Sequence, residues 1–175
     1  KSGAPVLSIC GGEPTIYPEL KELIEGMLRR RRHIYLCTNA LLLDTKVYGT
    51  IPPHKRLTLN IHLDGMRSTH DYVCDRNGVF DKAVAMIKEG KRLGYHVTTN
   101  TTVFKETEMS EIEDLCRLVS ELGVDGMMIS PGYHYESVDR DIFLSQREIR
   151  DAGGPPVIGI RTEVQTVHLV VDDPP

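Results

Sequence analysis

The sequence predicts an α/β domain whose strands run parallel in one sheet. First, short runs rich in β-branched residues alternate with segments of helical periodicity. Second, helices at short intervals between strands imply parallel pairing through right-handed crossovers, with the strands buried. Third, 175 residues with 40% apolar side chains suffice for one domain with a hydrophobic core.

The expected elements follow one another in a simple order. The strands cover residues 6–10, 34–38, 57–63, 96–103 and 127–130. A first helix opens at Pro18, and its buried face comprises Leu20, Leu23, Ile24, Met27 and Leu28. The second helix covers residues 81–93. The third begins with the capping-box pair Ser110 and Glu113, stops at Gly123 and buries Cys116 on its apolar stripe.

The charge balance favours neither nucleic acid nor an anionic membrane as a partner. Lys and Arg number 21 and Asp and Glu 25, for a net charge of -4. The basic run from Arg29 to Arg32 falls where the first helix should end, so a solvated helix end is expected, with phosphate binding as the minor alternative. Because no apolar stretch approaches the length of a membrane span and no signal segment starts at Lys1, we expect a cytoplasmic protein.

Polar residues follow the predicted strands at their carboxyl ends, where α/β folds collect ligands. The first strand runs into Gly11, Gly12, Glu13 and Pro14. Two glycines permit a sharp turn, and the carboxylate after them suits a bound ammonium group. Spacing alone favours the alternative, an ordinary strand-to-helix turn.

The later strands deliver further polar side chains to the same edge. These are Cys37, His62, Asp64, Asn100 and Ser130. Taken alone, a histidine here is more often structural than catalytic, and Asp-Gly is a common turn pair. The chain has four cysteines, Cys10, Cys37, Cys74 and Cys116, whose spacing matches neither a zinc site nor a compact disulfide framework.

A resemblance to a known family rests on motifs in a fixed order. Gly-Gly-Glu-Pro closes a strand, a Leu-Asp-Gly turn follows, and His70-Asp71 and Gly78-Val79-Phe80-Asp81 come next. In order and spacing these motifs resemble the radical S-adenosylmethionine (SAM) superfamily. The resemblance implies a partial parallel (β/α) barrel that holds strands two to six and lacks the first strand and the cluster loop. Such a partial barrel should expose two parallel edges and an open core.

The resemblance also implies roles for the polar residues at the strand ends. It assigns Gly11, Gly12, Glu13 and Pro14 to the amino group of SAM. It places His62 and Asp64 near the ribose and carboxylate of SAM, although many members have serine in place of His62. Asn100 and Ser130 would lie near the sugar and the adenine.

Three segments are similar to the adenosylhopane synthases of hopanoid biosynthesis. They are residues 3–6, 35–43 and 130–136, and the similarity reaches Gln146. It divides the chain into a partial barrel at 1–146 and a divergent or disordered tail at 147–175. It implies that a deoxyadenosyl radical made from SAM adds to the double bond of the hopanoid diploptene, and that Cys37 quenches the resulting carbon radical. The alternative for Cys37 is a small buried residue that ends a strand.

The same resemblance implies a 4Fe-4S cluster, whose ligands would follow the pattern Cys-x3-Cys-x2-Cys. No pair of cysteines in this chain has that spacing, so we expect an amino-terminally truncated piece that is inactive by itself. The complete enzyme would take electrons from a flavodoxin or ferredoxin and its hopanoid substrate from the membrane, with transient contact at the inner membrane. The alternatives are a peptide-modifying branch of the superfamily and a cluster-free α/β binding remnant.

Overall fold

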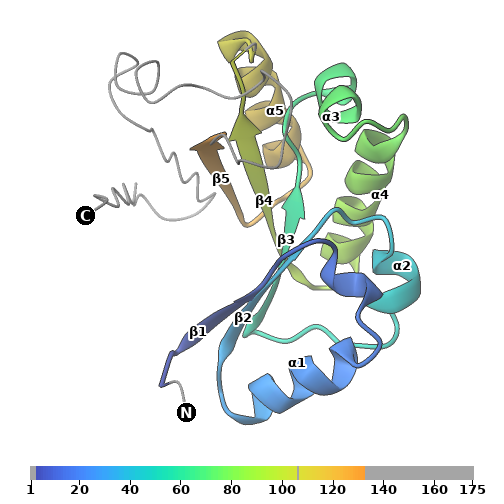
Figure 1. Ribbon diagram of the computed structural model, residues 1–175, viewed down its shortest axis with the longest axis vertical. Coiled ribbons are helices and arrows are strands. Elements are labelled where there is room, and N and C mark those ends of the chain that lie inside the picture. Colours follow the sequence, from blue (N-terminus) through green and yellow to red (C-terminus); the bar gives the residue numbers. More distant parts are fainter. Residues whose placement is uncertain (1–2, 106, 133–175) are drawn as a thin grey trace.

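A single parallel sheet forms the centre of the computed structural model, which describes residues 3–105 and 107–132 (Figure 1). The strands are β1 (Val6–Ile9), β2 (His33–Thr38), β3 (Leu57–His62), β4 (His96–Val103) and β5 (Gly126–Pro131). They pair in sequence order, and every pair is parallel. The predicted α/β class and the parallel pairing are therefore confirmed.

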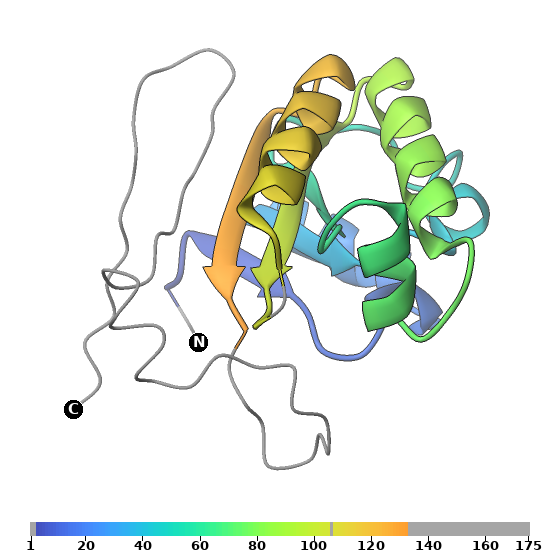
Figure 2. The same cartoon turned by 90° about the horizontal axis from the view of Figure 1, so that it is seen from above.

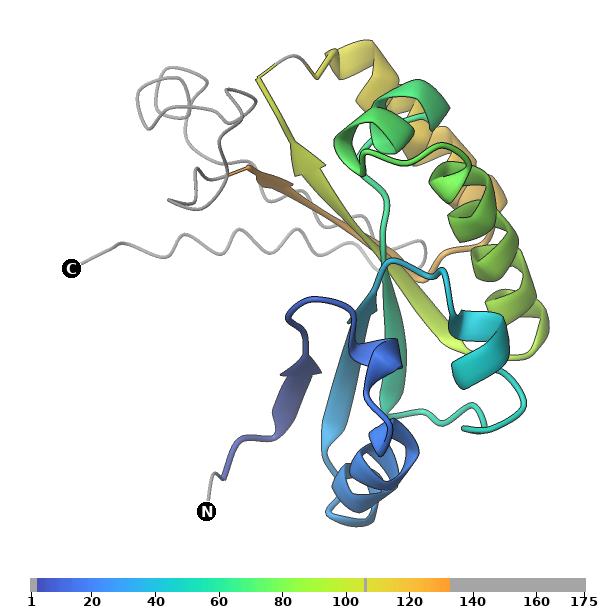
Figure 3. The ribbon, with the colours of Figure 1, turned by 45° about the vertical axis from the view of Figure 1, so that its right-hand side comes forward.

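The helices cover one side of this sheet. They are η1 (Pro14–Ile16), α1 (Leu20–Arg29), α2 (Leu43–Lys46), α3 (Arg67–Val73), α4 (Val79–Arg92) and α5 (Met109–Glu121). Helices α4 and α5 lie side by side on the outer side of the strands (Figures 2 and 3). The other side of the curved sheet carries no helix of the described residues, so the structure is the half-barrel expected for strands two to six.

The hydrophobic core lies between the strands and the helices. Alternate residues along each strand point toward the helices, and Leu36, Leu59, Ile61 and Val97 are each 0% exposed. Complete burial of a side chain of this size contributes about 1.5–3 kcal/mol. The alternation leaves the remaining strand positions on the opposite, concave face, where the candidate site lies.

The sheet ends at two open edges within the described residues. Among the strands of residues 3–105 and 107–132, β1 pairs only with β2, and β5 pairs only with β4. Val6 on β1 is 48% exposed and Met128 on β5 is 45% exposed. Both edges expected of a partial barrel are therefore present.

Several predicted boundaries need correction. Helix α5 begins at Met109, and its N-cap residue is Glu108, whose side chain makes no capping bond, so the predicted Ser110–Glu113 capping box is wrong. Helix α4 begins at Val79, two residues before the predicted start, and Leu23 of α1 is 37% exposed instead of buried. Cys116 is half-buried against the core.

Part of the predicted chain organisation lies outside the described residues. This part comprises the motif at 133–136, the predicted boundary at Gln146 and the tail at 147–175. Helix α1 ends at Arg29, as the position of the arginine run predicted. Across residues 3–105 and 107–132, no helix has the length and apolar character of a membrane span.

Substitution of Gly90 tests how tightly α4 packs against Tyr48, in the segment that follows α2. A Cβ atom at Gly90 would lie 2.6 Å from the hydroxyl oxygen of Tyr48, which donates a hydrogen bond to the carbonyl of Met86. Gly90→Ala should therefore lower the free energy of unfolding by about 1–2 kcal/mol, despite the better helix propensity of alanine. Urea denaturation measures the change.

Gly26 on α1 provides the matched control. A Cβ atom there would meet only arginine side-chain nitrogens, at 3.6 Å and beyond. Gly26→Ala should raise the free energy of unfolding by about 0.5–1 kcal/mol, because only the helix-propensity term acts. Equal effects of the two substitutions would contradict the tight contact at Gly90.

Candidate functional site

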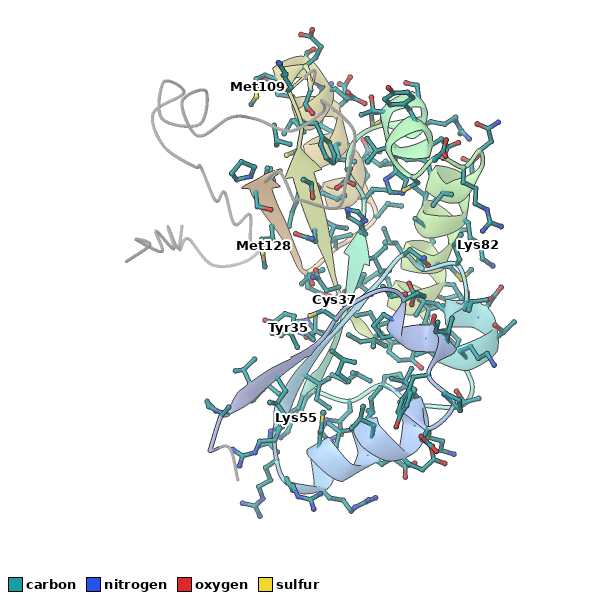
Figure 4. All side chains as sticks on the ribbon, viewed as in Figure 1. Tyr35, Cys37, Lys55, Lys82, Met109 and Met128 are labelled. Carbon is teal, nitrogen blue, oxygen red and sulfur yellow. The ribbon has the colours of Figure 1, made fainter. Side chains whose placement is uncertain are left out.

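The carboxyl ends of all five strands meet at one edge of the half-barrel, because the strands are parallel. Figure 4 shows Cys37 on the side of the sheet away from the helices, with Tyr35 and Met128 on the same side. This side is the concave face. The predicted site residues fall into two groups along the edge, one at β1 and β2 and the other at β3 to β5.

Cys37 lies in a row of polar side chains that crosses the concave face. In the strand register, Cys37 pairs with Asn60 and Asn60 pairs with Thr98. The amide of Asn60 donates to the Cys37 sulfur at 3.6 Å, and the Thr98 hydroxyl donates to the Asn60 carbonyl oxygen at 3.0 Å. The side chain of Asn60 is thus held in one orientation toward the thiol.

The side chain of Cys37 is a protonated thiol at neutral pH. Burial raises its pKa, the hydrogen bond from Asn60 lowers it, and the neighbouring Cys10 raises it, with a net upward shift. The protonated form carries the S–H hydrogen that a hydrogen-atom donor needs, whereas a nucleophile would need the thiolate.

Glu13 joins the end of β1 to the end of β2. Its Oε1 accepts from the backbone N–H of Thr15 at 3.0 Å, and from the hydroxyls of Thr15 at 2.6 Å and Thr38 at 2.7 Å. Its Oε2 accepts from the backbone N–H of Asn39 at 2.8 Å. The carboxylate therefore has a structural role that the motif did not reveal, and Oε2 keeps capacity for one more donor, such as an ammonium group.

The two glycines before Glu13 have backbone conformations that favour glycine. Gly11 has φ 93° and Gly12 has φ 53°, in the region that other residues rarely adopt. Both are exposed, and Pro14 is buried at the start of η1. The exposed backbone groups of this turn are therefore open to a ligand.

Asp64 is the buried centre of the second group. It is 0% exposed, its Oδ1 accepts from the backbone N–H of Thr102 at 2.7 Å, and its Oδ2 lies 2.6 Å from Nε2 of His62. Burial lowers the pKa of His62, but the hydrogen bond and charge of Asp64 outweigh it, so the net pKa is raised. The pair holds the imidazole of His62 at the rim, the edge of the half-barrel formed by the carboxyl ends of the strands.

His70 accepts a hydrogen bond from the backbone of Asp64, although the sequence motif that contains it implied no role for it. Its Nδ1 accepts the backbone N–H of Asp64 at 3.1 Å, and the side chain is only 1% exposed. Burial lowers the pKa of His70. A neutral imidazole with a free Nδ1 lone pair suits this contact, so His70 positions Asp64 and His62.

Asn100 lies on the concave side of β4, and Ser130 lies on the concave side of β5. Asn100 pairs with His62 across β3 and β4, and Ser130 pairs with Thr102 across β4 and β5. Thr102 is the residue whose N–H binds Asp64. The structure thus brings His62, Asp64, Asn100 and Ser130 into one neighbourhood, while Cys37 and Glu13 lie at the other side of the same edge.

Two carboxylates that fix the surrounding loops were absent from the predicted site. Asp71 accepts from the backbone N–H groups of Gly78 at 2.7 Å and Phe80 at 2.9 Å, which orients the start of α4. Glu111 accepts from the backbone N–H of Met66 at 2.7 Å and so ties α5 to the loop after β3. The His70-Asp71 motif was a sequence signal for Asp71. Glu111 lies 45 residues from Met66 in the sequence, and no motif pointed to it.

Glu13 also lines a hollow of about 460 Å³ at the rim. The loop after β2 contributes Asn39 to its wall, and the start of α4 contributes Gly78 and Lys82. Lys82 is ion-paired with Asp44. Side chains of both charge signs therefore surround this space.

The residues of the candidate site fit the chemical groups of SAM but do not fit a 4Fe-4S cluster. Residues 3–105 and 107–132 contain no group of three or more His, Cys, Asp or Glu side chains that could hold a metal ion, so these residues do not fit a 4Fe-4S cluster. The acceptor capacity of Glu13, the exposed glycine backbone and the His62–Asp64 pair do fit the charged and polar groups of SAM. The assignment of each residue to SAM stays a prediction.

Comparison with known proteins decides the family. The Radical SAM superfamily matches residues 1–119 of this chain. The chain belongs to the radical SAM superfamily. It is 29% identical over 122 residues to the AdoMet-dependent heme synthase of Methanosarcina barkeri, a match that covers 69% of this chain and 35% of that protein.

Other relatives represent different branches of the radical SAM superfamily. The GTP 3',8-cyclase of Aquifex aeolicus is 28% identical, with 71% of this chain and 39% of that protein covered. The subtilosin biosynthesis protein AlbA of Bacillus subtilis is 27% identical, with 70% and 28% covered. The chain thus spans 28–39% of the length of these relatives. The superfamily is confirmed, and the adenosylhopane branch stays a prediction.

Solved structures agree with the radical SAM fold. Streptococcus suis SuiB superimposes with a TM-score of 0.70 at 19% identity, covering 85% of this chain and 35% of that chain. TYW1 superimposes with a TM-score of 0.62 at 21% identity, covering 83% and 47%. At this identity the likeness concerns the fold alone.

Proposed function

We propose that this chain forms part of the barrel of a radical SAM enzyme that adds the adenosyl group of SAM to the double bond of the hopanoid diploptene. In this proposal Cys37 donates the hydrogen atom that ends the reaction. The observation that carries it is the placement of a protonated thiol on the concave face, at the carboxyl ends of the strands and beside Asn60.

The hydrogen-atom step involves one bond broken and one formed. Addition to an alkene leaves an unpaired electron on a carbon of the product. The S–H bond of Cys37 breaks, the hydrogen atom forms a new C–H bond, and a thiyl radical remains on the sulfur. One electron from a flavodoxin or ferredoxin and one proton from solvent then restore the thiol.

The chain's other residues would bind and orient SAM. Glu13 offers acceptor capacity to the amino group, next to the exposed backbone of Gly11 and Gly12. His62, fixed by Asp64, is the polar group at the end of β3. When bound to its cluster, SAM supplies the adenosyl radical chemistry; these residues supply binding and orientation.

Because diploptene is hydrophobic, the proposed enzyme would obtain this substrate from a membrane. A triterpene hydrocarbon partitions into the bilayer, so the enzyme would take it up by transient contact with the inner membrane, from the cytoplasmic side. The open concave face supplies apolar surface: Tyr35, two residues before Cys37 on β2, is 36% exposed, and Met128, on β5, is 45% exposed.

A peptide-modifying radical SAM enzyme is the second candidate function. It is supported by the similarity to AlbA and by the fold likeness to SuiB, whose structure is also known bound to its precursor peptide SuiA. The two candidates make different products. Diploptene would give adenosylhopane, whereas a peptide substrate would change mass without gaining an adenosyl group.

The test uses the complete gene product, reconstituted anaerobically with iron and sulfide and assayed with SAM, diploptene and a flavodoxin in D2O. A thiol exchanges with solvent, so the adenosylhopane should carry one deuterium at the quenched carbon. Cys37→Ala should still cleave SAM but yield this product at least about 10-fold more slowly, since quenching must find another donor. Mass spectrometry of product and of 5'-deoxyadenosine measures both.

Cys116→Ala is the matched control, because Cys116 contacts Met127 at the core, remote from the concave face. It should keep the wild-type product and rate. The same product at the same rate from Cys37→Ala would contradict a catalytic role. A complete gene product that binds SAM but assembles no cluster would instead identify a binding remnant.

A further inference from the structure

The sulfur atoms of Cys10 and Cys37 lie 3.7 Å apart at the mouth of the half-barrel. Ile9 pairs with Leu36 in the strand register, so Cys10, the next residue, lies level with Cys37. Neighbouring strands run about 4.8 Å apart, which falls within the Cα separations that disulfides span. The backbone geometry therefore permits a bond once small side-chain rotations bring the two sulfurs together.

The two cysteines differ in their exposure. Cys10 is exposed and Cys37 is half-buried, so a reagent from solvent meets Cys10 first. The other cysteines have different neighbours: Cys74 lies 3.8 Å from Nε2 of His70, and Cys116 lies 3.8 Å from the sulfur of Met127. Among the described residues, Cys10 and Cys37 are thus the cysteine pair positioned for a disulfide.

The chain around Cys10 has room to adjust. Gly11 and Gly12 follow it directly, and a Cβ atom at either would meet no heavy atom within 4 Å. Cys37, in contrast, lies within β2 and is held by Asn60. A small movement of Cys10 toward a fixed Cys37 closes the gap without disturbing the core.

We propose that Cys10 and Cys37 form a reversible intramolecular disulfide, made by thiol–disulfide exchange with a small-molecule disulfide of the glutathione type. The Cys10 sulfur attacks the external disulfide, forms a mixed disulfide and releases one free thiol. The Cys37 sulfur then attacks Cys10, and the second free thiol leaves. The protein loses two electrons and two protons, and both appear in the two molecules of reduced thiol.

Formation of the Cys10–Cys37 disulfide would block the last step of the proposed reaction. This effect rests on the proposed function: if Cys37 is the hydrogen-atom donor, the disulfide removes its S–H hydrogen and halts product formation until a dithiol reductant reopens the disulfide. Burial raises the pKa of the Cys37 thiol, so the second exchange step should be faster at alkaline pH, where more thiolate is present. Reversible disulfides of this kind in reducing compartments are typically redox-sensing or catalytic.

The experiment incubates the chain, with chelator and without iron, with oxidised glutathione and counts free thiols. The fully reduced chain has four cysteines, and we expect two of them to disappear together. Proteolysis under acid conditions should then release one cross-linked pair of peptides that contain Cys10 and Cys37, and dithiothreitol should separate them. This readout needs no cluster and no activity, so its failure differs from failure of the proposed function.

Matched variants separate closure from ordinary thiol modification. Cys37→Ser should stop at a stable glutathione adduct on Cys10, and Cys10→Ser should react more slowly overall because the exposed sulfur is gone. The double variant Cys74→Ser, Cys116→Ser should still close. Separate glutathione adducts on Cys10 and Cys37, with no cross-linked peptide at any pH, would overturn the proposal.

Discussion

Replacement of Asp64 with alanine should lower the free energy of unfolding by about 2–4 kcal/mol, the largest effect we expect of any single change at the site. The carboxylate is completely buried and binds both the backbone N–H of Thr102 and the imidazole of His62. Its removal leaves the Thr102 N–H without its acceptor and opens a space beneath the rim. Urea denaturation of the chain measures the loss.

Asp64→Asn separates the hydrogen bond from the charge. Asparagine can keep an acceptor for Thr102 but removes the negative charge beside His62. We therefore expect a smaller loss of stability, together with a fall in the pKa of His62, because Asp64 is what raises that pKa. An NMR titration of the histidine measures this shift, and an unchanged His62 pKa would contradict the pairing.

Replacement of Glu13 with alanine should cost about 2–3 kcal/mol, since the carboxylate accepts hydrogen bonds from Thr15, Thr38 and Asn39. These bonds tie the turn after β1 to the end of β2. The loss should be local to β1, an edge strand, so hydrogen exchange of the β1 amides should accelerate more than that of the β4 amides.

The same substitution should also weaken SAM binding if the predicted role is correct. Glu13→Gln keeps the acceptor oxygen but replaces the other carboxylate oxygen with a donor, which repels the N–H of Asn39 and an ammonium group alike. Calorimetric titration with SAM should therefore show weaker binding by the Glu13→Gln variant. The control is Glu19→Gln, because Glu19 lies on the exposed turn before α1. SAM affinity equal to wild type would leave Glu13 a purely structural residue.

The carboxylates of the site and the polar residues within its strands differ in what holds them in place. Backbone N–H groups donate to the carboxylates of Glu13, Asp64 and Asp71, and these hydrogen bonds anchor the segments that carry them. Cys37 and Asn60 are placed by the strands themselves. The rim can thus present polar groups at defined positions even though each lies at the end of a different strand.

The sequence by itself determined the class of fold and the succession of the strands along the chain, and it predicted the edge of the sheet at which the site lies. These follow from local patterns: β-branched runs predict strands, and the turn residues after them mark the carboxyl ends. Helices α2 and α3 were missed, because four and seven residues are too few to show a helical period. The start of α5 was misplaced because Glu111 binds Met66 across space and no side chain caps the helix.

Only the tertiary structure decided which distant residues touch. The contact between Cys10 and Cys37 depends on the register of β1 against β2, and the burial of Asp64 depends on Thr102 and His70, 38 and six residues away in sequence. A motif records the identity and spacing of residues along the chain. Strand register and burial instead arise from the packing of the whole sheet against its helices, so they became visible only in the folded chain.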